Sequence, residues 1–178
     1  MNLLILPRLL IPVEATPGET RVSATPETVK TFVSLGCSVC LERGAGTPAG
    51  YLDAAYADQG ADLVSPGDAD AWSGADVLLC VQTPSSDALG RLRRGALVVG
   101  LLEPYANEAL SAALERGGLS AMALELLPRI SRAQAADALS SQANIAGYKA
   151  VLMGAACLDR FMPMLMTAAG TVQPAKVV

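Results

Sequence analysis

The sequence contains no histidine, few aromatic residues and little charge. Its 178 residues include one tryptophan, four tyrosines and two phenylalanines, and only 17% of residues are charged. Without histidine, the chain lacks the side chain that most often serves as a general acid or base. No stretch approaches the roughly 18 consecutive apolar residues of a membrane helix, and the start lacks the basic region of a secretory signal. These absences predict a soluble, cytoplasmic protein without acid–base or covalent catalysis by its side chains.

Positive charge is also scarce. The formal net charge is -4 and the pI is near 4.8, and the only basic cluster is Arg91, Arg93 and Arg94. A nucleic-acid surface would require a broader basic face. We interpret the three arginines as the solvated end of a helix, and we expect no nucleic-acid partner.

The four cysteines are Cys37, Cys40, Cys80 and Cys157. Cys37 and Cys40 form a CxxC pair on a predicted strand, where side chains three residues apart point to opposite faces. A zinc site would need two further ligands from distant residues. We therefore predict reduced, metal-free cysteines, with zinc binding as the less favoured alternative.

Apolar segments typical of strands alternate with segments typical of helices. Predicted strands cover residues 3–10, 38–42, 62–64, 76–81, 96–101 and 120–124, and predicted helices cover 25–35, 53–59, 85–93 and 107–116. Thr25 and Pro26 have the side chains expected at an N-cap and a first helical position. This alternation with short links predicts an α/β fold with an open parallel sheet, Rossmann-like or flavodoxin-like.

A long helix is predicted after the sheet. Residues 137–161 keep a helical apolar spacing, and Pro163 ends the pattern. Residues 169–174 indicate a loop, and 175–178 resemble the beginning of another strand. We therefore expect an N-terminal α/β domain over 1–136 and a long connecting helix over 137–162, followed by the first residues of a further domain over 163–178.

Two further motifs each allow two interpretations. The glycine-rich run 44–50 follows a strand, but Pro48 and Gly50 separate it from the next helical signal at Asp53. A phosphate-binding loop opens directly into a helix, so a plain turn is the better interpretation. Arg21 could bind a carboxylate through its forked donors, or it could be an ordinary surface arginine.

The richest polar segment lies between the sheet and the long helix. It brings Arg129, Gln134, Asp137 and Ser140 within twelve residues, among alanine, leucine and isoleucine. Guanidinium, amide, carboxylate and hydroxyl groups together form a versatile hydrogen-bonding set. The alternative is structural, because Asp137 or Ser140 could simply cap the long helix while Arg129 lies on the surface.

At these residues the chain resembles a known family. The runs RISRAQ (129–134) and DALSSQANIAGYKAV (137–151) closely resemble the soluble NAD-binding region of the alpha subunit of proton-translocating NAD(P) transhydrogenase. FMPMLMTAAGT (161–171) continues the resemblance, which implies that residues 163–178 are the start of a truncated NAD-binding domain. Upstream, RV (21–22), TPE (25–27), ERGAG (42–46) and ADV (75–77) fit the same family, so the resemblance spans nearly the whole chain.

The resemblance implies direct hydride transfer between NADH and NADP(+), coupled to proton movement through a separate membrane part. Arg129, Gln134, Asp137 and Ser140 match the family's loop beside the nicotinamide, and no metal is implied. The expected cofactors are NAD(H), whose main binding domain lies outside this chain, and NADP(H) on a partner component. The complete protein is expected to be a homodimer, peripheral to the inner membrane through its partner subunits, and this chain alone is expected to be inactive.

Two other functions remain open. Alanine dehydrogenase shares the fold, but it uses a catalytic histidine and a substrate-binding lysine. Gln82 stands where that lysine is expected, and residues 101–104 contain no histidine. The third possibility is a stand-alone interaction domain without catalysis.

Overall fold

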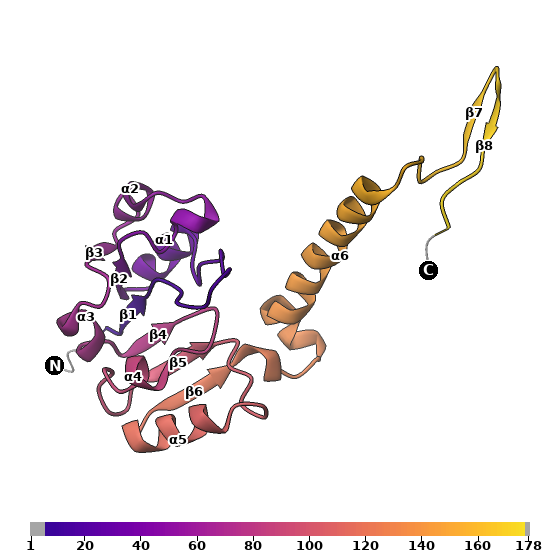
Figure 1. The fold of residues 1–178 in the computed structure, drawn as a ribbon. Helices are drawn as coiled ribbons and strands as arrows, with labels where there is room; N and C mark the ends of the chain where they lie inside the picture. Colours follow the sequence, from indigo (N-terminus) through magenta and orange to yellow (C-terminus); the bar gives the residue numbers. More distant parts are fainter. Residues whose placement is uncertain (1–5, 177–178) are drawn as a thin grey trace. The chain divides into compact units, whose positions relative to one another are not determined.

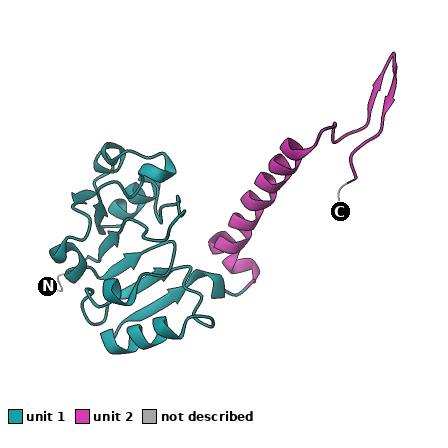
Figure 2. Cartoon of the chain, viewed as in Figure 1, with its two compact units in different colours: residues 1–128 teal, residues 129–178 magenta. Residues whose placement is uncertain are grey.

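The computed structural model describes residues 6–176, which form two compact units divided after Pro128 (Figure 2). The first unit holds a six-stranded parallel sheet in the order β3-β2-β1-β4-β5-β6. Its strands are β1 (Arg8–Ile11), β2 (Ser38–Glu42), β3 (Asp62–Val64), β4 (Val77–Leu79), β5 (Leu97–Gly100) and β6 (Ser120–Ala123). The predicted α/β class with an open parallel sheet is confirmed.

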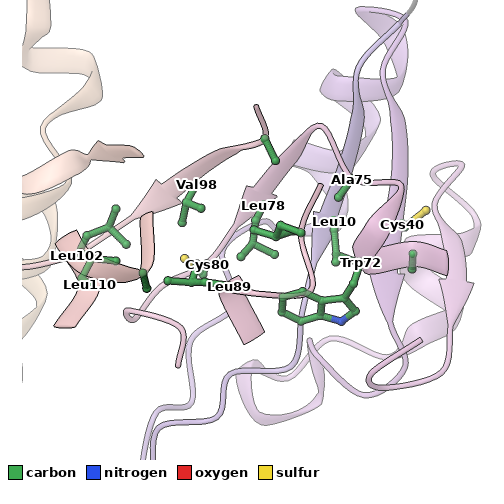
Figure 3. Close-up of a cluster of buried hydrophobic side chains, with 14 residues drawn as sticks. Leu10, Cys40, Trp72, Ala75, Leu78, Cys80, Leu89, Val98, Leu102 and Leu110 are labelled. Carbon is green, nitrogen blue, oxygen red and sulfur yellow. The ribbon is translucent and has the colours of Figure 1, made fainter. Parts of the chain in front are cut away.

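Helices cover both faces of the sheet (Figure 1). They are α1 (Pro26–Ser34), α2 (Asp53–Ala57), α3 (Ala69–Ser73), α4 (Ser86–Leu89) and α5 (Glu108–Gly117). On one face, α1 and α2 bury Val29 and Tyr56 against β1 and β2. On the other face, α3, α4 and α5 pack around Trp72 and Leu78, as Figure 3 shows. The inner strands β1, β2 and β4 therefore contribute apolar side chains to both covered faces, which explains their near-continuous apolar sequences.

Local sequence signals explain the ends of these helices. The Thr25 hydroxyl accepts the Thr28 N–H at the start of α1, with Pro26 in the first turn. Asn107 caps α5 in the same way, and Gly118 ends it in the left-handed conformation that favours glycine.

Several predicted elements are shorter in the structure, and one helix was not predicted. The strand predicted over 76–81, for example, is Val77–Leu79. The first strand is Arg8–Ile11 rather than 3–10, and residues 1–5 lie outside the described part. The helix predicted over 85–93 is only Ser86–Leu89, with Gly90 at its C-cap. Helix α3 was not predicted, because its five residues are too few to show an apolar period; Asp68 caps it by accepting the Ala71 N–H.

The second unit consists of a helical segment and a hairpin. A 3-10 helix, η3 (Ser131–Ala136), leads into α6 (Ala138–Cys157), and β7 (Leu165–Thr167) pairs antiparallel with β8 (Gly170–Val172). Helix α6 ends before the predicted residue 161 or 162. Leu158 is extended, and Asp159 would place a negative charge at the negative end of the helix dipole.

The hairpin corrects the loop predicted over 169–174. Thr167 and Gly170 flank a tight turn, and the Thr167 hydroxyl donates to the Gly170 carbonyl at 3.1 Å. Ala175 and Lys176 are not in a strand, and residues 177–178 lie outside the described part. No helix within residues 6–176 is long and apolar enough to cross a membrane.

Candidate functional site

The four predicted site residues lie on one short stretch of the second unit. Gln134 belongs to η3, Asp137 is the N-cap of α6, and Ser140 lies in the first turn of that helix. Arg129 precedes η3 and is exposed. The backbone N–H of Asp137 donates to the Gln134 carbonyl at 3.3 Å, which closes the turn between the two helices.

Asp137 and Ser140 are in direct contact. The Ser140 N–H donates to Asp137 Oδ1 at 2.9 Å, and its hydroxyl donates to Oδ2 at 2.6 Å. These hydrogen bonds, with a smaller contribution from the positive charge of Arg129, lower the pKa of Asp137. The structure thus shows that Asp137 caps α6. The ionised carboxylate of Asp137 and the exposed Gln134 side chain also lie on the same turn.

A second candidate region is the carboxyl edge of the sheet in the first unit. The strand order reverses between the neighbouring strands β1 and β4, because β2 and β3 are added on one side of β1 and β4, β5 and β6 on the other. In open α/β sheets the crevice at that point is the usual ligand site. A cavity of about 210 Å³ lies there. Its lining includes Glu14, Glu42, Trp72, Gln82, Thr83 and Arg91.

Carboxylates bind the loops of this edge to one another. Glu42, at the end of β2, accepts the N–H groups of Val13 and Gly67 at 2.8 and 2.7 Å, and also the Trp72 indole N–H at 2.8 Å. It is only 4% exposed. The loops after β1 and β3 are therefore held to β2 by one buried side chain.

The same arrangement continues along the edge. Glu14 accepts the N–H groups of Val81 and Gln82 after β4. Glu125, after β6, accepts the N–H groups of Leu102 and Glu103 after β5. The Thr83 hydroxyl donates to the Leu102 carbonyl at 2.9 Å and joins the two halves. We call Glu42, Glu14, Thr83 and Glu125 the edge belt.

Sequence analysis missed the edge belt, although a signal was present. Each of the three acids lies at the end of a predicted apolar strand or within about four residues after it, where parallel strands place their side chains at a common edge. An isolated acid after a strand is also common in ordinary loops, so that spacing alone does not identify its partner.

Arg21 binds a carboxylate of its own chain. Its Nε lies 2.8 Å from Glu19 Oε1, and a terminal nitrogen lies 2.6 Å from Oε2. The Gln82 amide donates to the same Oε2 at 2.8 Å. These hydrogen bonds lower the pKa of Glu19 to about 2. Of the two interpretations of Arg21, carboxylate binding is the one realised, and the carboxylate is internal.

The glycine-rich run 44–50 is a turn followed by a 3-10 helix over Thr47–Ala49. The Gly44 N–H donates to Asp53 Oδ1 at 2.8 Å, so this backbone donor is already occupied. The next α-helix begins only at Asp53, so the run does not open directly into an α-helix as a phosphate-binding loop does.

Cysteines and arginines singled out in the sequence make packing and charge contacts inside the first unit. Cys40 is buried with Trp72 on one face of the sheet, whereas Cys37 packs against the cluster on the opposite face. Arg91 lies 4.6 Å from the centre of the Trp72 ring, and Arg93 pairs with Asp76. Within the described residues, no three cysteine or acidic side chains are grouped as metal ligands would be.

The parallel sheet with helices on both faces defines an open α/β domain of the Rossmann-like kind. Sequence comparison identifies the particular family: residues 10–146 match the model of the alanine dehydrogenase/PNT N-terminal domain, and the chain belongs to that family. The predicted resemblance to the transhydrogenase alpha subunit is confirmed. The chain is 45% identical over 175 residues to an NAD(P) transhydrogenase subunit alpha protein of Rhodospirillum rubrum.

The match covers 96% of this chain but 45% of that relative, so the chain spans less than half the relative's length. Alanine dehydrogenase of Mycobacterium tuberculosis is 34% identical over 178 residues, again across 96% of this chain and 46% of the relative. Among solved structures, the transhydrogenase of Sinorhizobium meliloti superposes with a TM-score of 0.87 at 44% identity, over 94% of this chain and 50% of that one.

Proposed function

We propose that this chain is the N-terminal part of the NAD(H)-binding component of a transhydrogenase. That enzyme moves hydride between NADH and NADP(+), coupled to proton translocation through a separate membrane part. The observation that carries the proposal is the turn that holds Gln134, Asp137 and Ser140 together, within a chain 45% identical to a transhydrogenase subunit.

The side chains of this turn fit the nicotinamide end of NAD(H). Its carboxamide and ribose hydroxyls need hydrogen-bond donors and acceptors, which Gln134, Asp137, Ser140 and Arg129 supply. When bound, the cofactor provides the hydride, and the transfer needs two rings in near-attack geometry rather than an acid or base. The proposed role of these four residues is therefore to orient the cofactor.

The pyrophosphate of a dinucleotide does not fit the sheet edge of the first unit. Backbone N–H groups usually hold it, but here those of Val13, Gly67, Val81, Gln82, Leu102 and Glu103 already donate to glutamates. We therefore assign the pyrophosphate to a C-terminal NAD-binding domain.

NADP(H) is assigned to a partner component. The complete protein is proposed to be a cytoplasmic homodimer, peripheral to the inner membrane through its partners.

Alanine oxidation is the competing activity within the family. It is disfavoured because Gln82 is a neutral amide that donates to Glu19, and because the sequence has no histidine. A stand-alone interaction domain without catalysis is the third candidate, and the polar turn at 134–140 favours cofactor contact over it.

Reconstitution distinguishes the three candidates. The chain would be joined to the C-terminal part of the Rhodospirillum rubrum relative and mixed with an NADP-binding component. Stopped-flow absorbance would then follow hydride transfer from NADH to an NADP(+) analogue, and a parallel assay would follow NAD(+) reduction by L-alanine. Transfer in the first assay alone supports the proposal. Activity with alanine alone supports a dehydrogenase, and inactivity of a folded protein in both supports an interaction domain.

A further inference from the structure

The backbone N–H groups of Val81 and Gln82, which follow β4, both donate to the carboxylate of Glu14. The Val81 nitrogen lies 2.6 Å from Glu14 Oε1, and the Gln82 nitrogen lies 3.1 Å from Glu14 Oε2. Each oxygen thus takes one donor, which is how a free carboxylate would sit on two consecutive amides. Glu14 occupies the position of a ligand's carboxylate.

The surroundings are those of a ligand site. The N–H pair lies at the crevice between β1 and β4, where open α/β sheets bind their ligands. The cavity of about 210 Å³ beside it has room for a small molecule, and Trp72, Thr83 and Arg91 contribute to its wall. Donors and space are both present, and the anion is supplied by the chain itself.

We propose that the Val81–Gln82 N–H pair is a carboxylate-binding site which the protein fills with its own Glu14, and that Glu14 thereby closes the crevice to free small carboxylates. Glu14 is then a specificity-determining residue of this crevice. A free acid would have to displace one that is tethered by a short loop and is therefore present at high effective concentration. This proposal does not depend on the transhydrogenase function.

The charges around Glu14 agree with this role. Glu19 from the same loop and Glu42 from β2 repel a second anion. Arg21, also from the loop, attracts the Glu14 carboxylate, and Arg91, after α4, lines the same cavity. The Cys80 thiol at the end of β4 is protonated, because burial raises its pKa to about 12. Removing Glu14 would take away one negative charge, free the N–H groups of Val81 and Gln82 and leave both arginines in place, so the vacated site should accept an anion.

The test uses the 178-residue chain with Glu14→Ala, titrated with sodium formate against sodium chloride at equal ionic strength. We expect the backbone amide resonances of Val81 and Gln82 to shift saturably with formate in the variant and not in the wild type. A ligand of three heavy atoms limits the expected Kd to about 1 mM or weaker. The melting temperature of the variant should rise over the same concentrations.

Asp53→Ala is the matched control. It removes a carboxylate that accepts a single backbone N–H, that of Gly44, so formate should give no saturable shift there. A folded Glu14→Ala protein whose Val81 and Gln82 amides ignore formate would overturn the proposal, as would wild-type protein that binds formate there with the same Kd. If the variant does not fold in chloride, its refolding yield becomes the readout. Recovery in formate alone supports the proposal, and no recovery overturns it.

Discussion

Glu14 and Glu19 lie in one loop, yet their pKa values move in opposite directions. Burial is the largest effect on Glu14 and raises its pKa, although the N–H groups of Val81 and Gln82 oppose that change. Hydrogen bonds from Arg21 are the largest effect on Glu19 and lower its pKa to about 2. The difference follows first from burial, which is deeper at Glu14, and then from the donors: a guanidinium brings a full positive charge to Glu19, whereas two amides bring only dipoles to Glu14.

The lowered pKa of Glu19 predicts how the contribution of this residue to the stability of the fold changes with pH. A carboxyl group whose pKa is lower in the folded protein stabilises it above its ordinary pKa, and the contribution is lost as pH falls toward the folded value. Because Arg21 is 38% exposed, solvent screening limits the contribution to about 1–2 kcal/mol. In urea titrations, Glu19→Gln should therefore cost this amount at pH 7 and progressively less between about pH 5 and 2. A difference that stays constant with pH would contradict the ion pair.

Glu42 should be among the most sensitive positions of the fold. Glu42→Ala leaves the N–H groups of Val13, Gly67 and the Trp72 indole without their buried acceptor. Each unsatisfied donor costs about 1–3 kcal/mol, so the three together could cost about 3–9 kcal/mol. Because single substitutions rarely cost more than about 5 kcal/mol, we expect the free energy of unfolding to fall by roughly 3–5 kcal/mol. Denaturant titration would measure it. Asp58→Ala, an exposed acid, should change it by less than about 0.5 kcal/mol.

The cysteines should differ strongly in reactivity. Cys157 is exposed, whereas Cys40 and Cys80 are buried and burial raises the pKa of Cys80 to about 12. Because the thiolate is the reactive form, Ellman's reagent at pH 8 should modify Cys157 first and should reach Cys80 only on unfolding. Elemental analysis of the purified protein should find no stoichiometric zinc. Rapid modification of Cys80, or a bound zinc ion, would contradict the sheet packing.

At the scale of elements, α6 allows helix capping to be separated from cofactor binding. Asparagine caps a helix about as well as aspartate, so Asp137→Asn should change stability little, whereas Asp137→Ala should cost about 1 kcal/mol. If Asp137 also orients the cofactor, both variants should slow hydride transfer in the reconstituted protein, by an amount equivalent to about 1–3 kcal/mol. Stopped-flow rates decide this. A normal rate in Asp137→Asn would limit the residue to capping, and Gln134→Asn tests the neighbouring amide without touching the cap.

Elements with strong local signals were predictable. Strands β2 and β3 have the predicted bounds, because apolar runs between turn residues mark both ends. Helix α1 begins at its predicted cap, Thr25. Helix α3 and the β7–β8 hairpin were missed because each is only a few residues long, and their apolar residues show no period. The end of α6 depends on the single extended residue Leu158, which composition does not reveal.

The candidate site was partly predictable for a related reason. Asp137 and Ser140 are three residues apart at a helix start, so their contact follows from local geometry. The edge belt joins residues such as Glu14 and Gln82, which lie 68 positions apart. Such pairs depend on strand order, which is a property of the assembled sheet rather than of any one segment.

For the molecule as a whole, we predict that the 178-residue chain does not bind NADH usefully. The N–H groups of the sheet edge that could hold a pyrophosphate are bonded to glutamates. The few hydrogen bonds that Gln134, Asp137 and Ser140 could form contribute about 0.5–1.5 kcal/mol each, too little to offset the cost of ordering the ligand. Titration calorimetry should show no measurable heat of binding. A micromolar Kd would place the cofactor site in the N-terminal domain and contradict the proposed domain roles.

The two faces of the sheet differ in when they can close during synthesis. The buried residues of the face covered by α1 and α2 all lie between Leu9 and Ala61, whereas those of the opposite face extend from Leu10 to Ala113. A ribosome that releases the chain from its N-terminus therefore delivers the last buried residue of one core roughly fifty residues before that of the other. In that interval the apolar side chains of Leu10 and Cys40 lack the partners that Leu78 and Val98 later provide, so the nascent chain would pass through a one-sided sheet that is exposed to chaperones.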